Sequence, residues 1–253
     1  MTGIIKTDQL QGAQGTTVTV PTGNTLAVTS NATVGGTLGV TGTATLSGNA
    51  TIGSNSGDTR FHLNSANQYT MKFSNAGNVA GHLGGGGSDV LRFSNAAGGT
   101  MMEMNAGQIT KPLQPAFGAY GSGTSTLPIN TTYIPPLNLE RFDQNADYNT
   151  STYTFTAPVT GKYQLNAVAY LYHYLDNEAG YILMTITCSN DDYQFTVEGS
   201  LFGSDITHFH FSGSCLADMD AGDTAVMDLF QQGGTAQTTI SHGHTHFNGA
   251  LIC

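Results

Sequence analysis

The chain has 253 residues, of which 9% are charged and 33 are glycine, and its formal net charge is −10. This composition excludes a disordered polyelectrolyte and is atypical of a compact enzyme. Residues 1–110 hold four acids and four bases, whereas residues 111–253 hold thirteen acids and three bases, so the net charge lies in the C-terminal part. The acidic balance disfavours binding to a phosphate backbone, and we expect no nucleic-acid partner.

Neither a membrane span nor a secretion leader is expected. No run reaches the length of about 18 apolar residues that a span needs, and the N-terminus lacks a charged and then apolar pattern ahead of a cleavage site. The three cysteines, Cys188, Cys215 and Cys253, lack the spacing of a metal site. They favour free thiols in a reducing cytoplasm over one internal disulfide.

Residues 1–23 are expected to anchor the chain to a particle. The stretch MTGIIKTDQLQGAQGTTVTV resembles the N-termini of structural proteins of marine tailed phages, in which a short segment joins a fibre to the virion. The resemblance implies that this segment binds other virion proteins. An ordinary capping strand is the alternative.

Residues 24–54 repeat every six residues, as NTLAVT, SNATVG, GTLGVT, GTATLS and GNATIG. Two apolar columns result, Val28, Val34, Val40, Leu46 and Ile52 in one and Leu26, Ala32, Leu38, Ala44 and Ala50 in the other. The columns are two residues apart, so both lie on one face of a short strand. Five consecutive matches indicate repetitive β structure.

The hexad stretch is too short to bury a core within one chain. A hexapeptide solenoid uses about 18 residues per coil and needs about three repeats, which this stretch does not provide. Three chains wound around one axis, as an intertwined β-helix or prism, bury the apolar face and pair the open strand edges. We therefore predict a trimeric β-stalk, with a single-chain solenoid or a flexible linker as alternatives.

Residues 55–110 contain a second repeat, because MKFSNA at 71–76 recurs as LRFSNA at 91–96. Each copy predicts a short amphipathic strand ended by an Asn/Gly turn. The glycine run at 84–87 is not followed by Gly-Lys-Ser/Thr, which argues against a phosphate loop. We expect a glycine-rich β-repeat neck.

Residues 111–253 alternate apolar and polar residues without a helical period, which predicts an all-β sandwich. The expected strands are Tyr153–Phe155, Lys162–Leu175, Tyr181–Cys188, Tyr193–Val197, Thr207–Ala217, Thr224–Gln231 and Thr238–Ile252.

The same region carries a spaced signature of Asp143, Tyr148, Phe155, Gly161 and Tyr163, and it closes on an apolar strand at 247–252. The signature resembles the globular head shared by the q subcomponent of the first complement component, adiponectin-like proteins and, more distantly, tumour necrosis factor. The sequence departs from that pattern at three positions where the family has aromatic residues, namely Leu137, Leu165 and Ala167. The resemblance implies a ten-stranded jelly roll that trimerises through one sheet behind a trimeric stalk.

Five of the eight histidines fall in two short motifs, His208 and His210 in one and His242, His244 and His246 in the other. Strand alternation places each set on one face, opposite phenylalanines that belong in the core. The family's strand order places both motifs beside the 162–175 strand. In a trimer, such pairs supply six nitrogen ligands on the three-fold axis, which favours iron or nickel over zinc. The interpretation that we favour slightly is a set of polar strand residues, stacked across chains or exposed at the tip, and the metal site is the alternative.

We expect no enzymatic activity. Ser241 with His242, and the cluster of Asp218, Asp220 and Asp223, are the suggestive groups. The aspartates are better interpreted as an acidic turn that binds calcium loosely.

The leading hypothesis for function is the trimeric fibre of a tailed phage, assembled in the host cytoplasm and displayed on the virion. Its head would bind a host-surface glycan or protein through aromatic and polar loop residues. The candidate receptor-binding residues are Tyr172, Tyr174, Asn190, Asp191, Asp192 and Tyr193. A capsid-surface or purely structural appendage and a bacterial surface adhesin are the alternatives.

Overall fold

The computed structural model describes residues 25, 27–29, 32–34, 38–41, 44, 71–75, 78–85 and 90–253. The chain divides into two units, Met1–Phe61 and His62–Cys253. The predicted anchoring segment and most of the predicted hexad stalk lie outside the described residues.

Apolar side chains of the hexad columns are exposed wherever the first unit is described. Val28 is 51% exposed, Val34 and Val40 are each 52% exposed, and Leu38 is 72% exposed. No strand is assigned among the described residues before Met71. At these positions the described residues of the same chain do not bury the apolar side chains of the two columns.

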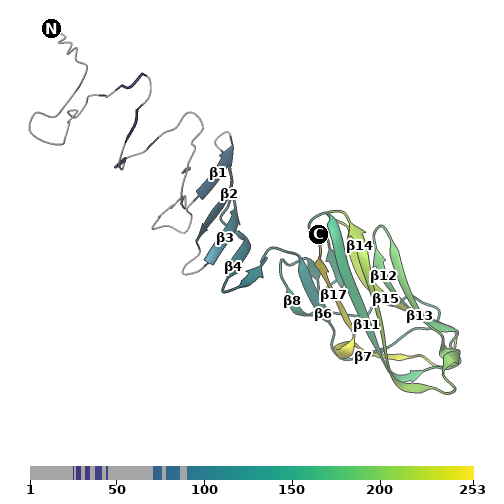
Figure 1. Ribbon diagram of the computed structural model, residues 1–253. Coiled ribbons are helices and arrows are strands. Elements are labelled where there is room, and N and C mark those ends of the chain that lie inside the picture. Colours follow the sequence, from purple (N-terminus) through teal and green to yellow (C-terminus); the bar gives the residue numbers. More distant parts are fainter. Residues whose placement is uncertain are drawn as a thin grey trace, which may run out of the picture. The chain divides into compact units, whose positions relative to one another are not determined.

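The second unit contains a five-stranded antiparallel meander, which we call the neck sheet (Figure 1). Its strands are β1 (Met71–Asn75), β2 (Asn78–Gly85), β3 (Val90–Asn95), β4 (Thr100–Asn105) and β5 (Gln108–Thr110). The two copies of the predicted repeat form β1 and β3, and the second ends in a turn in which Gly98 donates its N–H to Asn95 O at 3.0 Å. The prediction of two short strands is confirmed.

The C-terminal head, residues 111–253, is a sandwich of two antiparallel sheets, named here after their central strands β11 and β15 (Figure 1). The β11 sheet consists of β6 (Ala116–Tyr120), β7 (Thr124–Thr126), β8 (Leu139–Asp143), β11 (Gly161–Leu175), β14 (Ile206–Met219), β16 (Thr239–Ser241) and β17 (His246–Leu251). The β15 sheet consists of β9 (Tyr148–Asn149), β10 (Thr154–Thr156), β12 (Tyr181–Cys188), β13 (Asp192–Val197) and β15 (Thr224–Gln232).

The predicted all-β class is confirmed, because the only helices in the described residues are two short 3-10 turns, η1 (Gly199–Leu201) and η2 (His242–His244). No helix within the described residues is long and apolar enough to cross a membrane. The pair β7 and β16 continues the pair β6 and β17 along one edge of β11. If each interrupted strand is counted once, the head has the ten strands of the expected jelly roll.

Phe117 of β6 lies at the centre of the head's core. Its ring stacks on Phe155 at 4.6 Å and on Tyr148 at 5.2 Å, and it meets Phe247 edge-on at 5.1 Å. Phe155 in turn contacts Tyr163 at 5.5 Å. The aromatic residues of the sequence signature therefore form one buried cluster, and Phe117 joins its members.

Hydrogen bonds fix the polar ends of this cluster. The Tyr148 hydroxyl donates to Leu137 O at 3.0 Å, and the Tyr163 hydroxyl donates to Val159 O at 2.7 Å. The Asp143 carboxylate accepts the N–H of Tyr148 at 2.9 Å. Burial raises the pKa of both tyrosines, so their hydroxyls stay protonated donors.

Three residues depart from the family's aromatic pattern, namely Leu137, Leu165 and Ala167. Each of them is 1% exposed or less. They remain core residues of smaller size. Gly161, the signature glycine, has no room for a side chain, because a Cβ there would lie 2.5 Å from Cys253 O.

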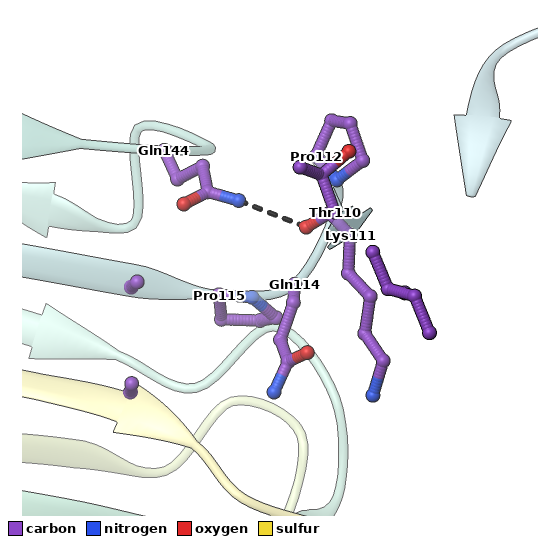
Figure 2. Close-up of a pocket in the computed structure, with 9 residues that line it drawn as sticks. Thr110, Lys111, Pro112, Gln114, Pro115 and Gln144 are labelled. Atoms are coloured by element: carbon purple, nitrogen blue, oxygen red, sulfur yellow. Dashed lines mark hydrogen bonds between the residues drawn. The ribbon is translucent and has the colours of Figure 1, made fainter. Parts of the chain in front are cut away.

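The sandwich has a near end, where the chain arrives from the neck, and a far end. At the near end, Leu251 donates its N–H to Pro115 O at 3.0 Å, and Gln144 Nε2 donates to Lys111 O at 3.0 Å beside a hollow of about 390 Å³ (Figure 2). At the far end β11 turns into β12, and Gly180 donates its N–H to Gln232 O at 2.9 Å.

Candidate functional site

The long strand β11 divides its residues between the core and the outer face of the β11 sheet. Its inward residues, Tyr163, Leu165, Ala167, Ala169 and Leu171, are all 1% exposed or less. Its outward residues are Gln164, Asn166, Val168, Tyr170 and Tyr172, and all are half-buried. As predicted, the histidine strands β14 and β17 flank β11 and run antiparallel to it.

The near half of this outer face is a ladder of neutral polar groups. Gln164 Nε2 donates to Ser214 Oγ at 2.6 Å, and the Ser214 hydroxyl donates to Asn166 Oδ1 at 2.9 Å. Asn166 Nδ2 then donates to Asn248 Oδ1 at 3.0 Å. The amides satisfy one another across β14, β11 and β17 without an ionised group.

The far half carries a group of aromatic rings, which we call the Tyr170 cluster and which comprises Tyr170, Tyr172, His208, His210 and His244. The Tyr170 ring lies 4.4 Å from His210 and 5.3 Å from His244, both edge-on, and 6.0 Å from His208 in a stacked arrangement. The Tyr170 hydroxyl and His208 Nδ1 are hydrogen-bonded at 2.5 Å. Tyr172 adds a second ring, 5.3 Å from His208.

His246 borders this cluster and lacks a partner for one ring nitrogen. Its Nδ1 is buried and has no hydrogen-bond partner in the described part of the chain. Burial lowers its pKa, and nearby Arg141, His244 and His210 lower it further. A neutral imidazole retains a lone pair that can accept a hydrogen bond or bind a metal.

The prediction of one continuous strand over Thr238–Ile252, with three histidines on one face, is wrong. Residues 242–244 form η2, in which Thr245 donates its N–H to His242 O at 3.2 Å. The turn rotates His242 into the sandwich, where it is 3% exposed, while His244 stays exposed.

No group of three or more His, Cys, Asp or Glu side chains within the described residues has the arrangement of a metal site. His208, His210, His244 and His246 do converge on one patch, whereas His242 lies apart from it. A metal shared between copies of the chain stays a prediction.

His242 is a structural residue of the β7 and β16 corner. Its Nδ1 donates to Ser122 O at 3.2 Å, so Nε2 accepts the hydroxyl of Ser125 at 2.8 Å. That hydroxyl also lies 2.5 Å from the hydroxyl of Tyr133. The pair of Ser241 and His242 considered in the sequence does not form, because the serine at Nε2 is Ser125. The partner of Nδ1 is a backbone carbonyl and not the carboxylate of a catalytic triad.

We expect acid to weaken the head through the buried His242 and the half-buried His246. Burial lowers the folded-state pKa of His242 and of His246, whereas an unfolded histidine titrates near pH 6.5. As the pH falls below about 6.5 the unfolded state binds protons first, so the free energy of unfolding decreases, by about 1.4 kcal/mol for each unit of pKa depression.

Urea unfolding at about pH 7.5 and about pH 5.5 checks this prediction, because carboxylates titrate mainly below that window. His242→Gln should reduce the pH dependence, because it removes an imidazole that is 3% exposed and whose pKa is lowered by burial. An unfolding midpoint that is the same at both pH values would contradict the expectation.

The candidate receptor-binding residues do not form one site. Tyr172 and Tyr174 belong to the far end of β11, and they are strand residues, not loop residues. Asn190, Asp191 and Asp192 follow β12 at the near end, where Asn190 Nδ2 donates to Asp218 O at 2.7 Å. The two groups lie at opposite ends of the sandwich.

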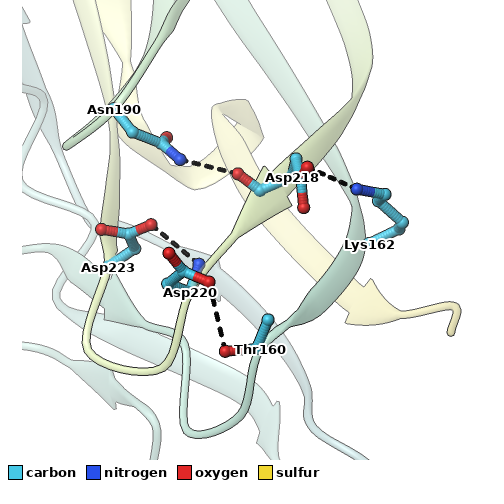
Figure 3. A network of polar contacts seen from close by, with 6 residues as sticks. All are labelled: Thr160, Lys162, Asn190, Asp218, Asp220 and Asp223. Carbon is cyan, nitrogen blue, oxygen red and sulfur yellow. Dashed lines mark hydrogen bonds and ion pairs between the residues drawn. The ribbon is translucent and has the colours of Figure 1, made fainter.

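The three aspartates of the predicted acidic turn, Asp218, Asp220 and Asp223, already have partners within the chain (Figure 3). Asp218 Oδ2 forms an ion pair with Lys162 Nζ at 2.5 Å, and Asp223 Oδ2 accepts the N–H of Asp220 at 2.8 Å. Asp220 Oδ1 accepts the hydroxyl of Thr160 at 3.3 Å. This network fixes the turn and does not favour the loose calcium site considered for it.

A polar network that the sequence did not predict builds the far end. Asp176, 2% exposed, accepts the N–H groups of Glu178, Thr235 and Ala236. Burial raises the pKa of Asp176, but these three bonds outweigh burial and lower it overall. Gln231, fully buried, donates to Ala236 O at 2.7 Å. The far-end loops are therefore held by ionised and amide groups.

All three cysteines are free thiols in the structure. Cys188 and Cys215 are buried, and burial raises the pKa of Cys188 to about 12 and that of Cys215 to about 11. Both thiols are therefore protonated and poorly nucleophilic at neutral pH.

Neither a protein-family model nor a curated protein matches the sequence. Among solved structures, the globular domain of zebrafish complement 1qA protein is similar at 22% identity and a TM-score of 0.42, over 55% of this chain and 98% of that chain. Murine APRIL, in structures at pH 8.0 and pH 5.0, is similar at 6% identity and a TM-score of 0.40, over 55% of this chain and 99% of its own. The strand order of the head itself defines an all-β sandwich of the jelly-roll type.

Proposed function

We propose that this protein is a virion fibre of a tailed phage, a homotrimer whose head binds a receptor on the host surface. The N-terminal residues attach it to other virion proteins, and the repeats space the head from the particle. Several heads per particle add avidity to each weak contact.

The observation that best supports the trimer is the absence of charged residues in the middle of the outer face of the β11 sheet, between the Lys162–Asp218 ion pair and the far end. The head has thirteen acids. No Asp, Glu, Lys or Arg stands at the outward positions of β11 from Gln164 to Tyr172, or at the positions paired with them on β14 and β17. On a three-fold axis each residue meets its own copies, so a charged residue there would meet like charges. The ladder of neutral amides and the Tyr170 cluster avoid this repulsion.

Exposed apolar residues border the same face. Leu216 of β14 is 56% exposed and Phe142 of β8 is 53% exposed. Contact with two further copies would remove both from water, which favours association.

The receptor site is assigned to the far end of the head. This end combines the exposed His173, which lies outside the Tyr170 cluster, with loops held in place by Asp176. Aromatic rings stack on sugar rings, and fixed backbone groups donate hydrogen bonds to hydroxyls. A trimer carries a formal charge of three times −10, so binding to an anionic receptor should weaken at low salt.

Competition for host cells tests this proposal. The isolated head, residues 111–253, is a suitable probe because every residue of its core cluster lies between Phe117 and Phe247. An excess of head should slow adsorption of the parent phage. His173→Ala at the far end should reduce the competition, and Asp192→Ala at the near end should not.

A head that fails to bind cells, together with normal adsorption of particles that lack it, would show that the receptor role is wrong. The protein would then be a structural appendage. The neighbouring genes distinguish the remaining hypotheses. Tail and capsid genes would favour a virion protein, and a secretion locus would favour an adhesin.

A further inference from the structure

The neck sheet has one apolar face and one polar face. Register places Met71, Leu83, Phe93 and Met102 side by side across β1 to β4. A second row on the same face runs through Leu91, Met104 and Ile109 of β3 to β5. Two adjacent rows of large apolar side chains thus cross the sheet at right angles to its strands.

The opposite face carries the ionised groups. Arg92 lies opposite Glu103, and the guanidinium donates to Glu103 Oε2 from Nε at 2.9 Å and from Nη2 at 2.7 Å. Thr110 continues this row on β5. Because neighbouring residues of a strand point to opposite faces, the alternation of Leu91, Arg92 and Phe93 separates the two faces completely.

Nothing in the described residues of the chain covers the apolar face. Phe73 is 49% exposed, Leu91 41%, Phe93 38%, Met104 39% and Ile109 61%. Monomeric soluble proteins rarely expose a contiguous apolar patch of more than a few hundred Å². A five-stranded sheet with one apolar face requires a second layer to bury that face.

We infer that the neck sheets of three copies of this chain pack their apolar faces against one another around the three-fold axis. This inference rests on the proposed trimer, because copies joined through their heads are already at millimolar effective concentration at the neck.

The distribution of charge favours further copies of this chain as the partners that cover the apolar face. It also indicates which face of the neck sheet points toward the axis. The rows from Met71 and from Leu91 bring no ionised group to an axis where each residue meets its own copies. The reverse orientation would bring three Arg92 and three Glu103 side chains into a dry interface at a large desolvation cost. Outward placement leaves each ion pair with the partial exposure that it has in one chain, where the two side chains are 21% and 23% exposed.

Cysteine cross-linking in the full chain tests the inference. Phe93→Cys, or Ile109→Cys as a second variant on the same face, is made with Cys253→Ser, which removes the one exposed native thiol. A short bis-maleimide is used, because packed sheets lie about 10 Å apart. Thr110→Cys on the polar face is the matched control.

Both apolar-face variants should cross-link copies about a hundredfold faster than the control, at a rate that does not depend on dilution. If light scattering shows a trimer and neither variant cross-links faster than Thr110→Cys, the inference is overturned and the proposed trimer stands. If light scattering shows a monomer of 26.4 kDa, the proposed trimer fails and the inference fails with it.

Discussion

Phe117→Ala should leave the head about 3–5 kcal/mol less stable, which is comparable to the whole free energy of unfolding of many domains. The side chain is fully buried, and its ring contacts Tyr148, Phe155 and Phe247 from both sheets and from the closing strand. Truncation would leave a cavity between two layers that no single neighbouring ring can fill. We therefore expect the variant to be largely unfolded or trapped in a loosely packed state.

Near-UV circular dichroism and urea unfolding of the isolated head measure this effect. The control is Leu201→Ala, because Leu201 lies in η1 outside the core cluster and is 71% exposed. The control should lose about 1 kcal/mol or less. Equal losses in the two variants would show that the aromatic cluster is not the centre of the core.

The sequence predicted four of the five rings of that cluster and missed the fifth. Tyr148, Phe155, Tyr163 and Phe247 belong to a spaced signature or to a clear apolar strand, whereas Phe117 lies in a short segment with glycine and proline nearby. The strand β6 exists because it pairs with β17 and β8, both distant in sequence. Local pattern cannot reveal a strand whose stability comes from such long-range pairing.

Only part of the candidate site could be predicted from the sequence, again because local pattern does not report long-range pairing or a change of backbone conformation. Alternation correctly placed His208 and His210 on the outer face of β14, which is a continuous extended strand. The same rule failed at His242, because a 3-10 turn shifts the phase of alternation within a segment that has the composition of a strand. Tyr170, the ring on which the histidines converge, carried no signal of its own, since only the pairing of β11 with both neighbours identifies it.

Amphipathic repeats were the more dependable signal in the neck. The copies at 71–76 and 91–96 became β1 and β3, which flank β2 and present their apolar residues on one face. What the sequence could not give is the register, because a slip by one residue would exchange the two faces. The Arg92 and Glu103 ion pair across β3 and β4 defines that register.

Val168→Arg should dissociate the trimer without unfolding the head. Val168 is the middle outward residue of β11, paired with Ser212 of β14 on one side and His246 of β17 on the other. Its side chain makes no hydrogen bond that the substitution would break, and arginine can extend into solvent from the outer face of a monomer. In a trimer, three guanidinium groups would instead be brought together in a dry interface, with no acid among the outward residues from Gln164 to Tyr172 or their partners on β14 and β17 to pair with them.

The expected cost is several kcal/mol for each of the three arginines, because each buried and unpaired charge carries a desolvation penalty of that order. Light scattering at micromolar concentration should therefore find the isolated Val168→Arg head as a monomer with an unchanged circular dichroism spectrum. Gln194→Arg adds the same charge at an exposed position of β13, on the other sheet, and should remain trimeric. A stable Val168→Arg trimer would place the interface elsewhere on the head. It would also leave the Tyr170 cluster open to solvent, where it would be available to the receptor itself.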